Sequence, residues 1–143
     1  MHFPLRLSLP FLPLLTPTMT ASTLPPSSPS SPITRIATFR FRDTVTAAQK
    51  GDRTAAFLAL YAANRELLLQ EPTGGRPLNT PLDLTDVKRE DGWDTGFVVV
   101  FKDEAAKKTF DLDPGHDRLK NETDPLLAQV FVYDFVAQPN LGW

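Results

Sequence analysis

The sequence predicts an α+β domain in which four antiparallel strands form one sheet and helices pack on one of its faces. Three observations predict this class. Strand-like and helix-like patterns follow one another in the order β-α-β-β-α-β between residues 33 and 136. Two of the predicted strands are apolar on both faces. The composition also changes near Ile33, because 8 of the 14 prolines precede it and all 17 acidic side chains follow it.

The first two elements are a strand and a long helix. Residues 33–42 alternate, with Ala37, Phe39 and Phe41 on one face, which is typical of a half-buried strand. The spacing of Thr46 and Gln49 matches a capping box, and apolar residues then recur at helical intervals. This pattern predicts a helix that extends to about residue 70.

A turn and an edge strand are predicted next. Residues 71–77 (EPTGGRP) combine two prolines with paired glycines, a composition typical of a turn. Residues 78–84 then place four apolar or β-branched side chains on one face of a second strand. Because Pro81 cannot donate a ladder hydrogen bond, this strand is expected at a sheet edge, before a polar loop over residues 85–94.

The second half repeats the alternation of strand and helix. Residues 96–101 (GFVVVF) form a continuous apolar run, which predicts a strand covered on both faces. Asp103 can cap a helix over residues 104–110. Asp113-Pro-Gly is expected to end that helix, and residues 117–128 are predicted to form an irregular helical piece. Residues 130–136 (VFVYDFV) close the domain as a second strand that is apolar on both faces.

The apolar outer face of this sheet requires a partner. Helices on one face leave the other face bare, and a large exposed apolar patch is unusual for a soluble monomer. The sequence therefore predicts a homodimer in which two sheets face one another. Asp134 interrupts the last strand and is expected to meet a backbone donor or an arginine across that interface.

Residues 1–32 are predicted to be a disordered leader rich in Pro, Ser and Thr, and residues 33–143 the folded domain. Prolines at positions 4, 10 and 13 break the apolar start, so no membrane span is expected. The protein is predicted to be cytoplasmic. Two alternatives remain open, because an acid-free leader is also compatible with targeting to an organelle or with secretion.

Composition excludes several kinds of site. The chain has no cysteine and only two histidines, which excludes disulfides, thiolate zinc sites and histidine-rich metal sites. Asp111, Asp113 and Asp117 lie near His116, but exposed turn aspartates around one histidine do not predict a metal site. No cofactor motif is present. The acidic domain also lacks the basic, aromatic pattern of an RNA-binding strand, so neither nucleic acid nor membrane is an expected partner.

Four segments in order resemble the stress-responsive dimeric α/β barrel (Dabb) family: residues 41–50, residues 92–101, Asp113-Pro-Gly-His116 and Val132-Tyr-Asp-Phe135. The resemblance covers residues 33–136, and the segment EPTGGRP is especially similar to fungal members. It implies a ferredoxin-like protomer that pairs sheet to sheet into an eight-stranded barrel.

The resemblance also implies site residues. A plant branch of the family cyclises linear polyketides with a histidine base, and that histidine corresponds to His116. The tyrosine that orients the base corresponds to Phe110, a first-strand histidine to Arg35, a pocket tyrosine to Phe57 and a pocket valine to Phe97.

Two functions follow. In the first, the barrel binds a small apolar or polyketide-like molecule, with Arg35, Phe57, Phe97 and Phe110 as candidate ligand-binding residues and no assigned reaction. In the alternative, the protein is a cofactor-free cyclase or related proton-transfer enzyme with His116 as its base, since the ordinary pKa of histidine, about 6.5, lies near working pH. Against a catalytic role, a histidine in this position can simply begin the next helix and bind a backbone carbonyl.

Overall fold

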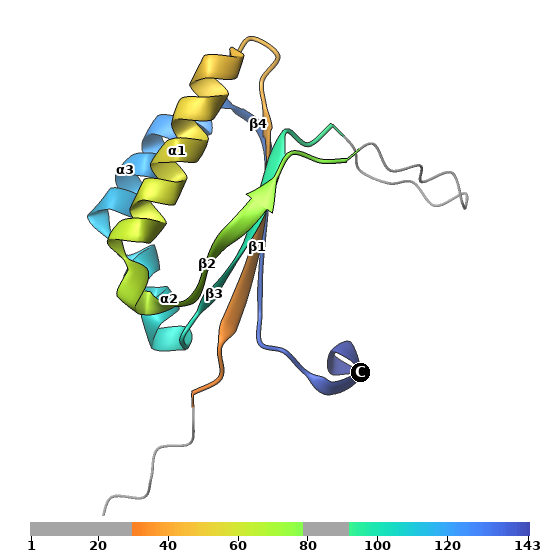
Figure 1. Cartoon of the computed structure of the whole chain (residues 1–143). Coiled ribbons are helices and arrows are strands. Elements are labelled where there is room, and N and C mark those ends of the chain that lie inside the picture. Colours follow the sequence, from red (N-terminus) through yellow and green to blue (C-terminus); the bar gives the residue numbers. More distant parts are fainter. Residues whose placement is uncertain (1–29, 79–91) are drawn as a thin grey trace, which may run out of the picture.

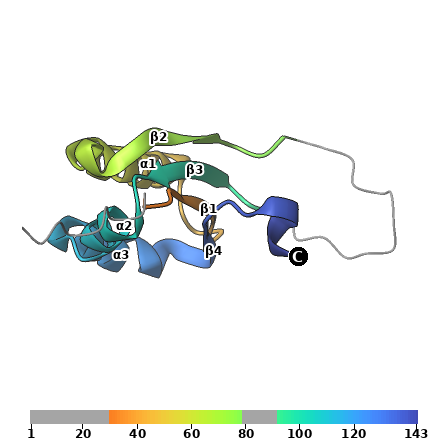
Figure 2. The same cartoon turned by 90° about the horizontal axis from the view of Figure 1, so that it is seen from below.

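The computed structural model describes residues 30–78 and 92–143 and confirms the predicted fold class. Its four-stranded antiparallel sheet has the order β2-β3-β1-β4, which Figure 2 shows from edge to edge. The elements are β1 (Ile33–Phe41), α1 (Ala47–Ala63), β2 (Leu68–Gly75), β3 (Thr95–Phe101), α2 (Glu104–Asp111), α3 (Pro114–Thr123) and β4 (Leu127–Phe135). All three α-helices lie on one face of the sheet (Figure 1).

Strand β1 lies inside the sheet and carries the alternation predicted for it. Ala37, Phe39 and Phe41 face the helices and are buried. The side chains between them are half-buried or exposed on the other face. Arg35 lies opposite Val99 of β3 and Asp134 of β4, which places a charged side chain within the buried face.

Helix α1 begins as predicted but ends earlier. Thr46 is its N-cap, and the capping box with Gln49 is complete: the Gln49 backbone N–H donates to Thr46 Oγ1 (3.2 Å) and the Thr46 N–H donates to Gln49 Oε1 (2.9 Å). The helix stops at Ala63 rather than near residue 70, because Asn64 leaves helical geometry and its side chain donates to the Leu60 carbonyl and to Asp113. The apolar residues beyond it belong to the short 3₁₀ turn Arg65–Leu67 and to β2.

The capping box gives a prediction for stability. We expect Thr46→Ala to lower the free energy of unfolding by about 1 kcal/mol, because the backbone donor near the helix start loses its acceptor. Thr109→Ala is the control, since this exposed threonine lies within α2 and caps nothing. Urea denaturation at one protein concentration measures both, and equal midpoints for the two variants would contradict the prediction.

The second strand was placed wrongly by the sequence pattern. Residues 68–75 form β2, so the segment predicted as a turn is mostly strand. The predicted strand over residues 78–84 lies, except for its first residue, outside the described residues, as does most of the predicted loop. Pro72 is tolerated because β2 is an edge strand with two register irregularities. Gly74 is required by a close approach, since a Cβ there would lie 2.0 Å from the Gly96 carbonyl oxygen.

The second half of the domain follows the prediction with shifted boundaries. The Asp103 side chain accepts from the Ala106 N–H at 2.7 Å and caps α2, as expected. Helix α3 begins at Pro114 rather than Asp117, because Asp113 caps it and proline is well suited to the first helical turn. It ends at Thr123, and β4 begins three residues before the predicted Val130.

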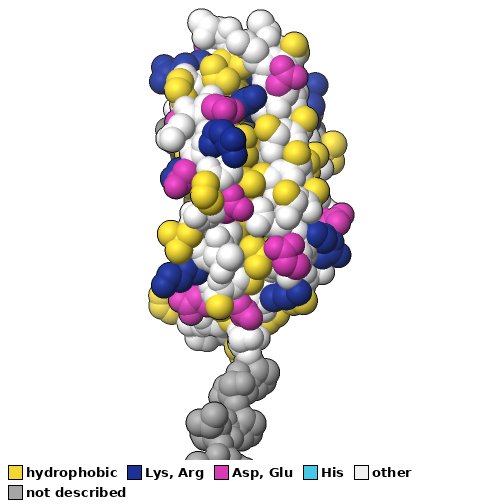
Figure 3. Space-filling view, turned by 90° about the vertical axis from the view of Figure 1, so that its left-hand side faces the viewer, with side chains coloured by type: hydrophobic (Ala, Val, Ile, Leu, Met, Phe, Trp, Pro, Cys, Tyr) yellow, Lys and Arg dark blue, Asp and Glu magenta, His cyan; other side chains and the backbone are white. Residues whose placement is uncertain are grey.

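The two faces of the molecule differ in character. The outer face of the helices carries acidic and basic side chains dispersed among small apolar ones (Figure 3), as is usual for a solvated surface. The open face of the sheet carries a row of aromatic rings on β4, in which Phe131, Tyr133 and Phe135 contact one another in sequence. Phe131 and Tyr133 are 49% and 54% exposed in the single chain. The predicted bare apolar face is therefore present.

Candidate functional site

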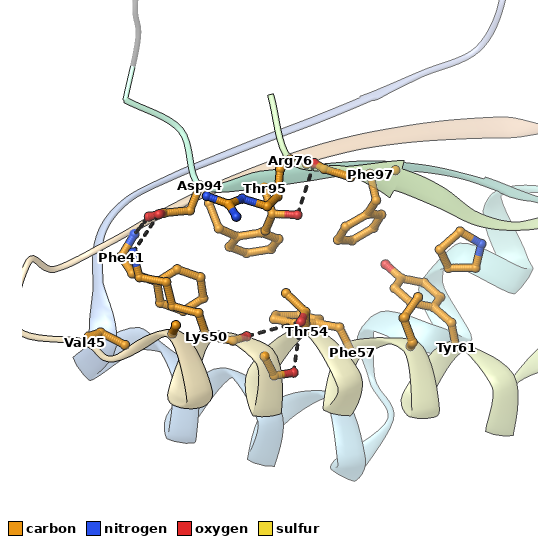
Figure 4. Close-up of a pocket in the computed structure, with 18 residues that line it drawn as sticks. Phe41, Val45, Lys50, Thr54, Phe57, Tyr61, Arg76, Asp94, Thr95 and Phe97 are labelled. Atoms are coloured by element: carbon orange, nitrogen blue, oxygen red, sulfur yellow. Dashed lines mark hydrogen bonds and ion pairs between the residues drawn. The ribbon is translucent and has the colours of Figure 1, made fainter. Parts of the chain in front are cut away.

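Two neighbouring cavities concern the candidate residues, and the larger lies between α1 and the β2–β3 side of the sheet (Figure 4). Its volume is about 560 Å³. Its apolar part is formed largely by aromatic and aliphatic side chains, among them Phe39, Phe41, Val45, Phe57 and Phe97. A concave apolar cavity of several hundred Å³ with few polar groups has the form of a small-molecule site.

One end of this larger cavity is charged. Lys50 Nζ lies 2.6 Å from Asp94 Oδ1, and the Phe41 backbone N–H donates to Asp94 Oδ2 at 2.8 Å. Arg76, directly after β2, also lines this end, and Figure 4 shows it on the same side as Asp94. Burial alone would raise the pKa of Asp94, but the hydrogen bonds from Lys50 and Phe41 and the charges of Lys50 and Arg76 lower it. Asp94 therefore stays ionised at neutral pH.

A smaller cavity of about 310 Å³ contains the sequence-predicted polar residues. Arg35 and His116 both line it, together with Lys120 of α3 and the edge strand β4. Phe57 and Phe97 line this cavity and the larger one. The structure thus places four of the five candidate residues around one cavity.

An aromatic wall separates the two cavities. It consists of Phe39, Phe57, Tyr61 and Phe97, which line both spaces. Their ring centroids lie 4.9 to 6.3 Å apart where they contact one another, within the range of favourable aromatic pairs. The wall is therefore a packed unit whose ring positions depend on one another.

Arg35 is held by carboxylates of its own chain. Its Nε lies 2.8 Å from Asp134 Oδ1 and its Nη1 lies 3.0 Å from Asp111 Oδ1, while its guanidinium sits over the Phe101 ring. Burial acts to lower the pKa of Arg35, but the hydrogen bonds to Asp134 and Asp111 outweigh it and raise the pKa. Asp134 does meet an arginine, but the expectation that this arginine lies across a subunit interface was wrong.

Tyr61 lines the site, although it was not among the candidate site residues predicted from the sequence. It is 3% exposed, lines both cavities and stacks on Phe110 with ring centroids 4.5 Å apart. Burial raises the pKa of its hydroxyl to about 12, against the opposing effect of the Arg35 charge. Tyr61 therefore remains a neutral hydroxyl next to the Arg35 cluster. The sequence signal that could have identified Tyr61 was its place on the apolar side of the predicted helix.

His116 lies in the first turn of α3, half-buried beside the smaller cavity. Its Nδ1 is 3.3 Å from the Asp111 carbonyl oxygen, and its ring packs 5.1 Å from that of Phe110. In the tautomer with the proton on Nδ1, that nitrogen donates to the carbonyl and Nε2 keeps its lone pair. The geometry is compatible with both a helix-start histidine and a base.

Phe110 lies behind the cavities rather than on their surface. It is fully buried between Tyr61, Phe101 and His116 and lines neither space. The sequence also did not identify the charged end of the larger cavity. Lys50, Arg76 and Asp94 come from three separate segments, and only their common position in the fold connects them.

The described residues contain no cluster of three or more His, Asp or Glu side chains arranged to hold a metal ion. Within the same residues, no helix has the length and apolar character needed to cross a membrane. The two cavities together present an apolar space with Lys50, Arg76 and Asp94 at one end and Arg35, His116 and Lys120 at the other.

The family follows from comparison with known proteins. The model of the Stress responsive A/B Barrel Domain (Dabb) matches residues 33–137, which is most of the chain. The chain belongs to the Dabb family. The match begins at the first residue of β1, where the composition of the sequence changes. The family match does not test the predicted similarity to fungal members, which stays a prediction.

Solved structures share the fold of this Dabb protein. A dimeric ferredoxin-like protein of unknown function from Thermobifida fusca is 26% identical, with 76% of this chain and 92% of that chain covered and a TM-score of 0.56. A hydroxynitrile lyase from Passiflora edulis is 17% identical, with coverages of 79% and 98% and a TM-score of 0.60. A cofactor-independent oxygenase from Streptomyces nogalater is 16% identical, with coverages of 80% and 100% and a TM-score of 0.56. No curated protein matches the chain.

Proposed function

We propose that this Dabb protein is a homodimer that binds a small apolar molecule in the cavities between α1 and the sheet. The observation that carries the binding part is the larger cavity, which has a volume of about 560 Å³ and a lining that includes several aromatic rings. Such a volume is of the size that holds a drug-sized ligand. No assigned reaction is needed for this function.

The homodimer is supported by the open face of the sheet and by the family. The aromatic row on β4 leaves Phe131 and Tyr133 about half exposed in the single chain, and Ile36, Val98 and Val100 continue the apolar surface across the sheet. A second sheet would remove these side chains from water. The structure from Thermobifida fusca with the same fold is described as dimeric.

The binding of an apolar molecule can be tested with a neutral fluorescent probe, N-phenyl-1-naphthylamine. We expect the wild-type protein to bind the probe with enhanced fluorescence and Thr54→Trp to weaken that binding at least about tenfold, because an indole at this lining position fills the cavity. Thr109→Trp, on the exposed side of α2, is the matched control and should bind like the wild type. Absence of probe binding, or equal binding by Thr54→Trp, would rule out the proposed site.

A second candidate function is proton transfer by His116, as in a polyketide-type cyclase. The observation that favours it is that His116 lines the smaller cavity and can present Nε2 as a base once Nδ1–H donates to the Asp111 carbonyl. Neutral Tyr61 and the charged Arg35 line the same cavity and provide polar groups for orienting a substrate. The neighbours described as a lyase and an oxygenase show that this fold supports catalysis.

The catalytic function predicts a rate that depends on His116. With a linear tetraketide thioester as substrate, His116→Ala should lower the cyclisation rate about a hundredfold, the usual contribution of a general base. Asp117→Asn, an exposed neighbour on the same helix turn, is the control. An unchanged product profile for His116→Ala, measured by mass spectrometry, would remove the catalytic function and leave ligand binding intact.

A further inference from the structure

The charged end of the larger cavity carries more positive than negative charge. Lys50 and Arg76 line it, and Asp94 is the only acidic residue among the lining residues that the structure describes. One carboxylate opposite two cations leaves a net charge of +1 beside an apolar interior. A ligand with an apolar body and a single negative charge would complement both parts of this cavity.

The charged groups at this end are held in position. Asp94 accepts the Phe41 backbone N–H and receives Lys50 Nζ, and Lys50 also lies over the Phe41 ring at 5.7 Å. The Lys50 and Asp94 side chains are 31% and 27% exposed, so they are partly shielded and can still reach a ligand head group. A fixed pair of this kind positions an ammonium group at the cavity mouth before any ligand arrives.

The cavity also determines the orientation in which an elongated apolar ligand would lie. In Figure 4 Lys50 and Asp94 lie toward one end of the cavity, and Phe97 and Tyr61 toward the other. An elongated chain entering from the charged end would therefore extend along the cavity and end against the aromatic wall. A neutral polar head would leave the excess positive charge at this end without an anionic partner, and a cationic head would be repelled by it.

We propose that the larger cavity binds an amphipathic carboxylate, with its carboxylate beside Lys50 and Arg76 and its apolar chain against Phe57 and Phe97. This inference rests on the proposed ligand-binding function and specifies the class of ligand. Arginine suits a planar carboxylate because its guanidinium can donate two parallel hydrogen bonds. Asp94 holds Lys50 in position. Its negative charge reduces the net charge at this end to +1, which one ligand carboxylate neutralises.

The experiment compares three ten-carbon probes that differ only in their head group: decanoate, 1-decanol and decyltrimethylammonium. Each displaces N-phenyl-1-naphthylamine from the full-length protein at pH 7.5 and low salt, where the carboxylate is ionised. Decanoate is expected to displace the probe at about tenfold lower concentration than decanol, because a charge-assisted contact adds to the same apolar burial. The cationic probe should be the weakest.

Substitutions at the mouth separate the head-group contact from general packing. Lys50→Gln and Arg76→Gln should each weaken decanoate several-fold and leave decanol unchanged, whereas Lys102→Gln, an exposed lysine outside the cavity, should change neither. Asp94→Asn keeps an acceptor for the Phe41 N–H but removes the negative charge, so it should tighten decanoate binding. Circular dichroism verifies that each variant is folded.

The outcomes distinguish the two proposals. If the neutral probe binds but decanol displaces it as well as decanoate does, the carboxylate assignment is wrong and the binding function stands. If Asp94→Asn weakens decanoate while Lys50→Gln leaves it unchanged, the charged end is structural and the assignment is also wrong. If no probe binds at all, both the inference and the proposed function fail.

Discussion

The Arg35→Ala variant is expected to lose about 3 kcal/mol of its free energy of unfolding, because removing the buried cation leaves the partly buried Asp111 and Asp134 to share Lys107 as their cationic partner. Among the described residues, Arg35 is the buried cation that contacts Asp111 and Asp134, and Lys107 of α2 reaches the same two carboxylates at 2.6 and 3.2 Å. The matched control is Arg65→Ala. Its ion pair with Glu71 is more than half exposed and should contribute little.

Two further measurements identify charge as the cause. Arg35→Met keeps an apolar stem over Phe101 and should still be destabilised, whereas the double variant Arg35→Met with Asp134→Leu should recover most of the loss. Chemical denaturation at a fixed protein concentration gives these values. Equal stability of Arg35→Met and the wild type would show that the ion cluster contributes no net stability.

The same ion cluster determines how the free energy of unfolding changes as the pH falls. Burial acts to raise the pKa of Asp111 and Asp134, but hydrogen bonds from Arg35 and Lys107 lower both below the ordinary value for aspartate. As the pH falls below about 4, these two carboxyl groups take up protons more readily in the unfolded chain than in the folded protein. The stability that the cluster contributes above that pH is therefore lost as the pH falls. Arg35→Met should show a shallower loss of stability, because Asp111 and Asp134 then have Lys107 but not Arg35 to lower their pKa values.

Tyr133→Asp is expected to convert the proposed dimer into a monomer. The substitution places a charge within the aromatic row of β4, directly on the open face that a second sheet would cover. Burying an unpaired carboxylate in an apolar interface costs several kcal/mol, which exceeds what a modest interface can offset. Light scattering at micromolar concentration measures the mass. A monomeric wild type would contradict the dimer outright.

A control variant separates interface disruption from a general effect of added charge. Ala105→Asp adds the same charge in the first turn of α2, on the solvated helical face, where an acidic side chain is favourable. This variant should keep the mass and unfolding midpoint of the wild type. If both variants dissociate, the open face is not the interface.

The elements defined by local patterns could be predicted from the sequence. The alternation in β1, the apolar run in β3 and the caps at Thr46 and Asp103 depend on neighbouring residues only, and the structure confirms each of them. The bare sheet face was also predictable, since the order of elements leaves no helix to cover it. These features require no knowledge of which distant segments meet.

The errors concern elements decided by distant contacts. Strand β2 combines Pro72 with paired glycines, so its composition is that of a turn, and it is a strand because it pairs with β3 and packs Gly74 against the Gly96 carbonyl. The end of α1 was missed because leucines beyond Ala63 continue an apolar run. The partners Asp134 of Arg35 and Asp94 of Lys50 lie 99 and 44 residues away. Strand register brings Asp134 to Arg35, whereas Lys50 meets Asp94 because α1 packs on the sheet beside the start of β3.

The aromatic wall between the cavities restricts how this site can change over evolution or in the laboratory. Because Phe39, Phe57, Tyr61 and Phe97 each border both spaces, a substitution at any of them is pleiotropic: it reshapes the two cavities at once. Independent adjustment is confined to positions that border one space only. Thr54 on the larger side and Val132 on the smaller side are therefore the starting points for redesigning one cavity without the other.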